Sequence, residues 1–263
     1  MIKPHSPLPP LTILLALAVA WSLVAPAGAD DWGTLKGRFV LGGELAGPAA
    51  LTVDKDVEVC GRHKLVAEEL VIGEGKGVAN VVVFVRDKKV KVKPEVAAAA
   101  KEAKPVLDNQ NCRFEPHVLF VQAGQELTIK NSDTVGHNSN IATVKNAPSN
   151  NLIPAGGEVK AKFSADEAVP AQVTCNIHPW MKGWLVVRDN PYAAVSKADG
   201  SFEIADLPAE EIELQFWHEK AGYLGEMTIG GKKETVKKGR MKKAIKAGDN
   251  NLGEIVLDAG LFK

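Results

Sequence analysis

The feature that most constrains this chain is a short stretch that holds three potential metal ligands in close succession. It reads TCNIHPWMKG, and in it Cys175, His178 and Met181 follow a C-x2-H-x2-M spacing. A thiolate, an imidazole and a thioether are soft or borderline ligands. A trigonal site of one Cys and two His with a long axial Met is typical of copper in electron transfer. The stretch lacks one ligand of that set, a second histidine.

A second histidine occurs upstream, in a polar turn that reads NSDTVGHN and contains His137 and Asn138. The turn follows the segment LTIK at 127–130, where apolar and polar residues alternate as in a strand with one buried face. Leu127 and Ile129 then point to the same face. The candidate metal ligands are therefore His137, Cys175, His178 and Met181.

Each of these residues also has a structural interpretation. A single cysteine in a β protein is usually a buried apolar group, and a methionine beside a loop histidine usually belongs to the core. Their joint spacing favours a metal site. Zinc is disfavoured because structural zinc sites use Cys and His and not a thioether. The loop has one cysteine, whereas a binuclear copper centre needs two, and the chain contains no C-x-x-C-H motif for covalent haem.

Residues 113–188 resemble a cupredoxin, the type 1 copper domain. The resemblance is carried by Pro116, the AGQ segment 123–125, the N-x-D…HN turn, the C-x2-H-P-x-M-x-G loop and the WLVV segment 184–187. The short loop is most similar to that of amicyanins, with pseudoazurins and plastocyanins as relatives with longer loops. The resemblance implies a Greek-key β-sandwich and one copper ion that alternates between Cu⁺ and Cu²⁺.

In such a site the four ligands have different roles. Cys175 provides the thiolate, which loses its proton on metal binding, and Met181 is the weak axial ligand that tunes the potential. His137 is the buried imidazole. We expect His178 to expose its ring edge through an apolar surface, where electrons enter and leave. The resemblance also implies that Asn138 bonds across to the backbone of the ligand loop near Cys175 and orients the ligands.

The length of 263 residues allows one large domain or two ordinary ones. Hydrophobic residues make up 45% and charged residues 24%, and Gly and Pro punctuate many short Val-rich runs, which favours a soluble all-β protein. Basic and acidic residues are equal in number, 32 each, so the overall charge indicates no polyanionic partner such as nucleic acid.

Residues 1–29 have the features of a signal peptide. Lys3 provides a positive start, Leu11–Val24 is apolar, and AGA at 27–29 matches a cleavage site. A membrane anchor is the alternative, but the apolar run is shorter than the roughly 20 residues that span a bilayer. We therefore expect export to the periplasm or outside the cell, with no stable membrane insertion after cleavage.

An exported chain with three cysteines usually has one disulfide and one free thiol. The copper site assigns Cys175 as the free thiol, which leaves Cys60 and Cys112 to pair in an oxidising compartment. The alternative is that all three are ordinary buried thiols.

A different pattern follows residue 190. The segment DGSFEIADLP at 199–208 and the segment IELQFWHE at 212–219 resemble carboxypeptidase regulatory-like, or transthyretin-like, β-sandwiches. That fold needs earlier strands, which residues 37–47 and 81–85 would supply. We therefore predict an all-β chain with a cupredoxin sandwich inserted into a second, smaller sandwich, although a tandem order stays open. The predicted boundaries are 30–93 for the first part of the regulatory-like sandwich, 94–190 for the cupredoxin domain and 191–263 for the remainder.

These observations predict an exported blue copper protein that carries single electrons between redox partner proteins and is not an enzyme. No nucleotide-binding, serine-hydrolase or zinc-protease motif occurs in the chain. One alternative is a non-redox module that binds glycan or protein, with a vestigial or storage copper site. Another is a catalytic copper subunit, but His63, His117 and His218 are too scattered to indicate a second metal site.

Overall fold

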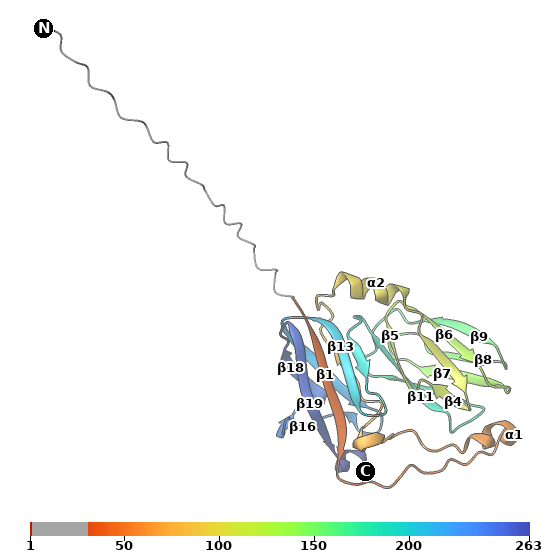
Figure 1. Ribbon diagram of the computed structural model, residues 1–263. Helices are drawn as coiled ribbons and strands as arrows, with labels where there is room; N and C mark the ends of the chain where they lie inside the picture. The colour runs from red at the N-terminus through yellow and green to blue at the C-terminus, as the bar shows by residue number, and fades with distance from the viewer. Residues whose placement is uncertain (2–30) are drawn as a thin grey trace.

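The computed structural model describes Met1 and residues 31–263. The expected signal segment, 1–29, lies outside the described residues except for Met1. The fold class is all-β, as predicted, with four sheets arranged as two sandwiches (Figure 1). Among the described residues, no helix has the length and apolar character that crossing a membrane requires.

One sandwich, called the site sandwich here, is formed by strands β3 to β11. A five-stranded sheet in the order β5-β11-β10-β7-β8 faces a four-stranded sheet in the order β4-β3-β6-β9. Leu127 and Ile129 on β6 are both fully buried in its core, which confirms the predicted face. The strands are β3 (Val106–Gln110), β4 (Arg113–Glu115), β5 (Val118–Gln122), β6 (Glu126–Asn131), β7 (His137–Ala142), β8 (Ser149–Ile153), β9 (Glu158–Lys162), β10 (Ala171–Thr174) and β11 (Lys182–Arg188).

The other sandwich, called the terminal sandwich, is built from strands near both ends of the described chain. Its two sheets have the orders β13-β1-β19-β16-β17 and β12-β2-β14-β15, and β18 also pairs with β14. The strands are β1 (Trp32–Gly42), β2 (Val82–Val85), β12 (Ala193–Val195), β13 (Ser201–Pro208), β14 (Glu211–His218), β15 (Gly222–Tyr223), β16 (Glu226–Ile229), β17 (Lys232–Thr235), β18 (Arg240–Ala244) and β19 (Gly248–Asp258). Five strands in each sheet make it larger than the site sandwich, so the prediction of a smaller second sandwich is wrong.

The strand pairing joins distant parts of the sequence. β1 pairs with β13 on one side and, in parallel, with β19 on the other, whereas β2 lies between β12 and β14. The ladders of β3 to β11 are all formed among those strands. These are the pairings that a nested arrangement of the two sandwiches requires. The domain boundaries at 93/94 and 190/191 stay a prediction.

The two sandwiches pack through β2, β14 and β11, which are buried on both faces. Because successive side chains on a strand point to opposite faces, Val83 and Val85 enter the terminal core while Val82 and Phe84 face the other way. The latter two contact Val186 of the site sandwich in a small apolar cluster. The Val-rich run at 81–85 is thus a strand buried on both faces.

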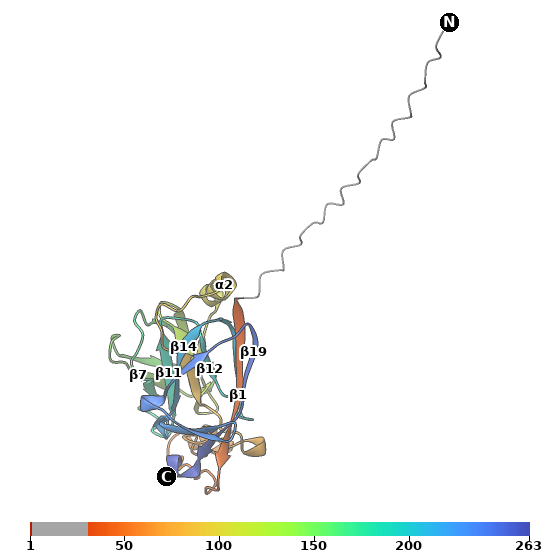
Figure 2. The same cartoon turned by 90° about the vertical axis from the view of Figure 1, so that its left-hand side faces the viewer.

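Helices are short and lie at the edges. α2 (Pro94–Glu102) begins with proline, whose fixed φ suits a first helical turn. Figures 1 and 2 both place α2 at the end of the molecule where β1 starts. The other helical segments are α1 (Val57–Cys60), η1 (Gly61–His63), η2 (Glu74–Lys76), η3 (Lys237–Gly239) and η4 (Ala259–Phe262).

Between β1 and β2 the chain makes a long excursion to the site sandwich (Figure 1). We call residues 51–65 of this excursion the strap. Its base is closed by a hydrogen bond from the Leu51 N–H to the Leu65 carbonyl, at 2.9 Å. Leu65 and Cys60 are buried in the core of the site sandwich. The disulfide between Cys60 and Cys112 confirms the predicted pair and ties the strap to the site sandwich.

Candidate metal centre

Three adjacent strands of one sheet present the predicted ligands. β7 begins at His137, β10 ends at Thr174 immediately before Cys175, and β11 begins directly after Met181. β10 pairs with both β7 and β11, so the ends of these strands lie side by side. Residues far apart in the sequence therefore meet at one end of the site sandwich.

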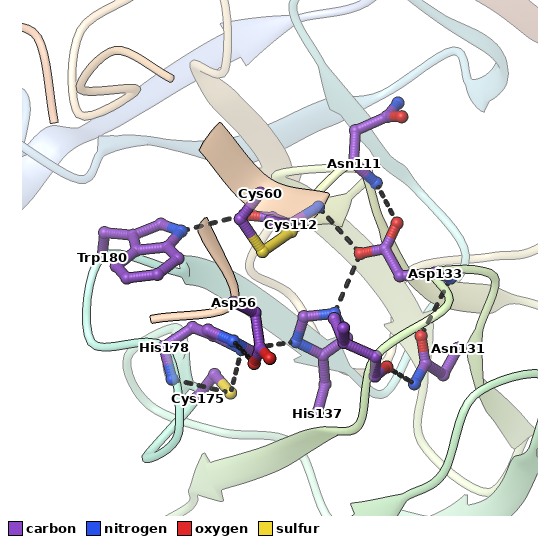
Figure 3. Close-up of a disulfide and its surroundings, with 11 residues drawn as sticks. Asp56, Cys60, Asn111, Cys112, Asn131, Asp133, His137, Cys175, His178 and Trp180 are labelled. Atoms are coloured by element: carbon purple, nitrogen blue, oxygen red, sulfur yellow. Dashed lines mark hydrogen bonds and ion pairs between the residues drawn. A yellow bond between two sulfur atoms is a disulfide. The ribbon is translucent and has the colours of Figure 1, made fainter. Parts of the chain in front are cut away.

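The side chains of His137, Cys175 and His178 converge in a buried pocket (Figure 3). The two Nδ1 atoms are 2.9 Å apart, and the Cys175 Sγ lies 3.8 Å from the Nδ1 of His178. The three ligand atoms all lie within 4.8 Å of one another. The side chains are 0%, 2% and 0% exposed, respectively, which means that an ion bound among them would be shielded from water.

Met181 is buried in the same core, and its backbone closes the ligand loop. Its N–H donates to the His178 carbonyl at 2.9 Å, and its carbonyl accepts from the Cys175 N–H at 3.3 Å. These two bonds hold the loop in a tight turn between β10 and β11. The role of Met181 as an axial ligand stays a prediction.

The donor set fits copper. One thiolate and two imidazole nitrogens that converge on one point are the equatorial ligands of a type 1 site. A second group, formed by Cys112, Asp133 and His137, also has suitable spacing. The Cys112 sulfur is already bonded to Cys60, so this second group cannot supply a thiolate.

The Nε2 of His137 forms a hydrogen bond with the Oδ2 of Asp133, at a distance of 2.9 Å. The Asp133 carboxylate also accepts backbone N–H bonds from Asn111 at 2.7 Å and Cys112 at 2.8 Å. Because an ionised carboxylate only accepts, the His137 Nε2 carries the hydrogen. Its Nδ1 is then oriented toward Cys175 and His178.

His178 differs from the expectation. Its ring is fully buried instead of exposing an edge to solvent, so the predicted exposure is wrong. Its Nε2 lies 2.8 Å from the Oδ2 of Asp56, a residue of the strap. The Trp180 ring lies beside it, with centroids 5.0 Å apart. The strap thus places a carboxylate against the outer nitrogen of the buried His178 ring.

Asn138 lies next to His137 and contacts the ligand loop. Its Oδ1 accepts from the backbone N–H of Asn176 at 2.7 Å and of Ile177 at 3.3 Å. Its Nδ2 donates to the Oδ1 of Asn150 at 2.7 Å. The contact predicted between Asn138 and the backbone beside Cys175 is therefore present in the structure.

The pocket shifts the pKa of each ligand. Burial lowers the pKa of His137, but the hydrogen bonds with Asp133 and Cys175 outweigh it and raise that pKa to about 9. Burial raises the pKa of Cys175, but the interaction with His137 and backbone N–H bonds bring it below its ordinary value. Burial lowers the pKa of His178 despite its bond to Asp56. At neutral pH a metal ion would therefore have to displace a proton from His137, whereas the lowered pKa values of Cys175 and His178 favour metal binding.

Two residues of this pocket were missed in the sequence. Asp133 was visible as the acid four residues before His137 in a polar turn, which brings the two side chains together. Asp56 gave no comparable signal, because it is separated from His178 by 122 positions. The only hint was its place four residues before Cys60, whose disulfide anchors the strap.

The other three histidines lie outside this group. His63 is exposed on the strap. His117 is buried and forms a hydrogen bond with Glu219, whose other oxygen accepts from the Trp184 Nε1 at 2.6 Å. His218 is fully buried beside Phe262, and burial lowers its pKa to about 4.

No family model matches the chain, and no curated protein matches it either. Among solved structures, it is similar to a copper-containing nitrite reductase from Thermus scotoductus SA-01, with 20% identity and a TM-score of 0.31 over 34% of this chain. The match covers 23% of the nitrite reductase. A reduced proline-to-glycine mutant of amicyanin matches 40% of this chain with 20% identity and a TM-score of 0.30, over 98% of its own length. A purple cupredoxin from Nitrosopumilus maritimus matches 32% with 23% identity and a TM-score of 0.27, over 98% of its own length. The solved structures named here are thus cupredoxins and a copper nitrite reductase, each similar to one part of the chain.

Proposed function

We propose that this chain is an exported type 1 copper protein that carries single electrons between redox partner proteins. The observation that supports this proposal is the convergence of one thiol sulfur and two imidazole Nδ1 atoms, all within 4.8 Å, in a pocket closed to water. In the proposal His137, Cys175 and His178 hold one copper ion, and the buried Met181 is its weak axial ligand.

Bound copper would supply a one-electron couple between Cu⁺ and Cu²⁺. The residues of the chain contribute a site that keeps its shape in both states. His137 and Cys175 lie at the ends of paired strands, and Asn138 bonds the ligand loop to β7 at the backbone of Asn176. A site with little freedom to rearrange changes oxidation state with a low barrier.

Two further features fit an exported carrier. Disulfides persist in oxidising compartments such as the periplasm or the extracellular space, and Cys60 and Cys112 form one. We propose that the terminal sandwich is a transthyretin-like, regulatory-like domain in which the copper domain is nested, with the boundaries at 93/94 and 190/191. Such a domain would tether the copper site to a larger assembly.

Metal analysis and an absorption spectrum of the purified chain without residues 1–29 test the proposal. We expect one copper ion per chain and an intense visible band from thiolate-to-copper charge transfer. The Cys175→Ser variant should lose this band, while Thr174→Ser, one residue away, should keep it. A wild-type chain without the band would contradict the proposal, and so would a Cys175→Ser variant that stays coloured. A reversible one-electron wave in voltammetry would exclude a purely non-redox module.

A further inference from the structure

We propose that Asp56 is a positioning residue of the copper site, delivered by the strap to fix and cover the imidazole of His178. The inference rests on the proposed function and deepens it. It assigns to a segment outside the site sandwich a part in holding the metal.

The contact itself is direct. The Oδ2 of Asp56 lies 2.8 Å from the Nε2 of His178, whose ring is fully buried. A carboxylate accepts hydrogen bonds and cannot donate when ionised, so this contact places the hydrogen on Nε2. The lone pair of the neutral ring is then on Nδ1, the atom that faces Cys175 and His137. Asp56 thus selects the tautomer that can bind a metal ion.

The same arrangement occurs at His137. There Asp133 binds Nε2 and leaves Nδ1 pointing inward (Figure 3). Both imidazoles are therefore held from outside by carboxylates, and their inner nitrogens lie 2.9 Å apart. Metal-binding histidines commonly donate their second N–H to a carboxylate, which fixes the ring and raises its basicity. Asp56 completes this pattern for the second ring.

The strap holds Asp56 in place through its backbone. Asp56 has φ 46° and ψ 41°, a left-handed conformation that Asp adopts more readily than most residues. Its carbonyl accepts from the N–H of Val59 at 2.9 Å and of Cys60 at 2.8 Å, and Cys60 is bonded to Cys112. Its side-chain contact with His178 is therefore set by a turn that a disulfide anchors.

Cys112 connects this anchor to both sides of the pocket. Its N–H donates to Asp133 at 2.8 Å, and its carbonyl accepts from the Trp180 Nε1 at 3.3 Å. Trp180 in turn lies against the His178 ring. The strap, the disulfide and the two carboxylates thus form one connected support around the ligands.

Loss of the Asp56 charge should change the affinity and the reduction potential of the bound copper, and not only the stability of the fold. A negative charge beside a ligand favours Cu²⁺ over Cu⁺, so Asp56→Asn should raise the reduction potential. Loss of such outer partners typically weakens metal binding by about 10- to 100-fold. Asn suits the left-handed backbone at this position, so the strap should keep its conformation.

The test compares Asp56→Asn with Asp54→Asn, which removes the same charge from an exposed position of the same strap. Copper titration and voltammetry of the full mature chain should show weaker binding and a higher potential for Asp56→Asn alone. Asp56→Glu keeps the charge and should recover part of the affinity. In the metal-free chain, nitrogen–proton NMR should show His178 with its hydrogen on Nε2, slow to exchange with water in the wild type and faster in Asp56→Asn.

The outcomes separate the two proposals. If the wild type has the visible band but Asp56→Asn matches Asp54→Asn in affinity, potential and exchange, the inference about Asp56 is wrong and the proposed function stands. If the wild type binds no copper, the proposed function and the role of Asp56 toward the metal both fail.

Discussion

The two sandwiches differ in what they bury. Around the ligands, the site sandwich buries polar side chains that each have a hydrogen-bond partner, such as Asn131, His137 and Asn138. The main core of the terminal sandwich is a large apolar cluster that includes Phe39, Phe202 and Phe216. Burying polar groups is costly unless each finds a partner. Both sandwiches thus have an apolar core, and the site sandwich in addition holds the buried polar cluster of the candidate site.

The strap connects these two regions of the molecule. It is part of the excursion that leaves the terminal sandwich after β1 and returns to it at β2. Its side chains pack on the site sandwich, and one of them contacts a candidate ligand. The two sandwiches therefore differ in the polar groups they bury, and the candidate site includes a residue from outside its own sandwich. If the two regions are separable, a change in the terminal core should lower stability without altering the metal site.

Phe216→Ala should have the largest effect on stability. Phe216 is fully buried and packs edge to face with Phe39, with ring centroids 6.1 Å apart. Truncating such a phenylalanine costs about 3 to 5 kcal/mol in the free energy of unfolding. Denaturant unfolding measures this loss, and the folded fraction should keep its visible band. Leu152→Ala, at a residue that is 69% exposed, should change stability little. Loss of the band from folded Phe216→Ala would show that the sandwiches are not separable.

Replacing both Cys60 and Cys112 with serine should have the next largest effect. The disulfide closes a loop with a sequence separation of 52. Removing a crosslink of this size typically costs about 2 to 4 kcal/mol, because the unfolded chain gains freedom. The strap should also become the first site of cleavage in limited proteolysis, while hydrogen exchange in the terminal sandwich should change less. If hydrogen exchange became faster to the same extent in both sandwiches, the disulfide would not act mainly on the strap and the site sandwich.

The smallest expected effect concerns pH and His218. Its pKa is about 4 in the folded chain, because burial disfavours the charged ring, and about 6.5 when unfolded. The unfolded chain therefore takes up a proton first as the pH falls. The stability associated with the neutral ring is full above about pH 6.5 and is lost toward pH 4, up to about 3 kcal/mol.

Unfolding experiments across this pH window measure the effect. His218→Gln should show a flatter dependence than the wild type, whereas His63→Gln, at an exposed residue, should leave the dependence unchanged. Identical pH profiles for the wild type and His218→Gln would show that this buried histidine does not titrate as inferred.

Much of the fold and the site could be predicted from local patterns. The alternation at 127–130 indicated the buried face of β6, and the Val-rich run at 81–85 indicated a strand buried on both faces. The ligand spacing around Cys175 and the turn at His137 were also readable, because each depends on a few consecutive residues. The disulfide followed from assigning the third cysteine to the metal.

The sequence by itself indicated which residues are candidate metal ligands and where several of the strands lie, since side-chain type and periodicity are local properties. Only the tertiary structure decided that His178 is covered and that Asp56 is the residue that covers it. The physical reason is that burial depends on which distant segment packs against a surface. Here that segment is a strap from the other sandwich, held in place by a crosslink and by its own apolar contacts.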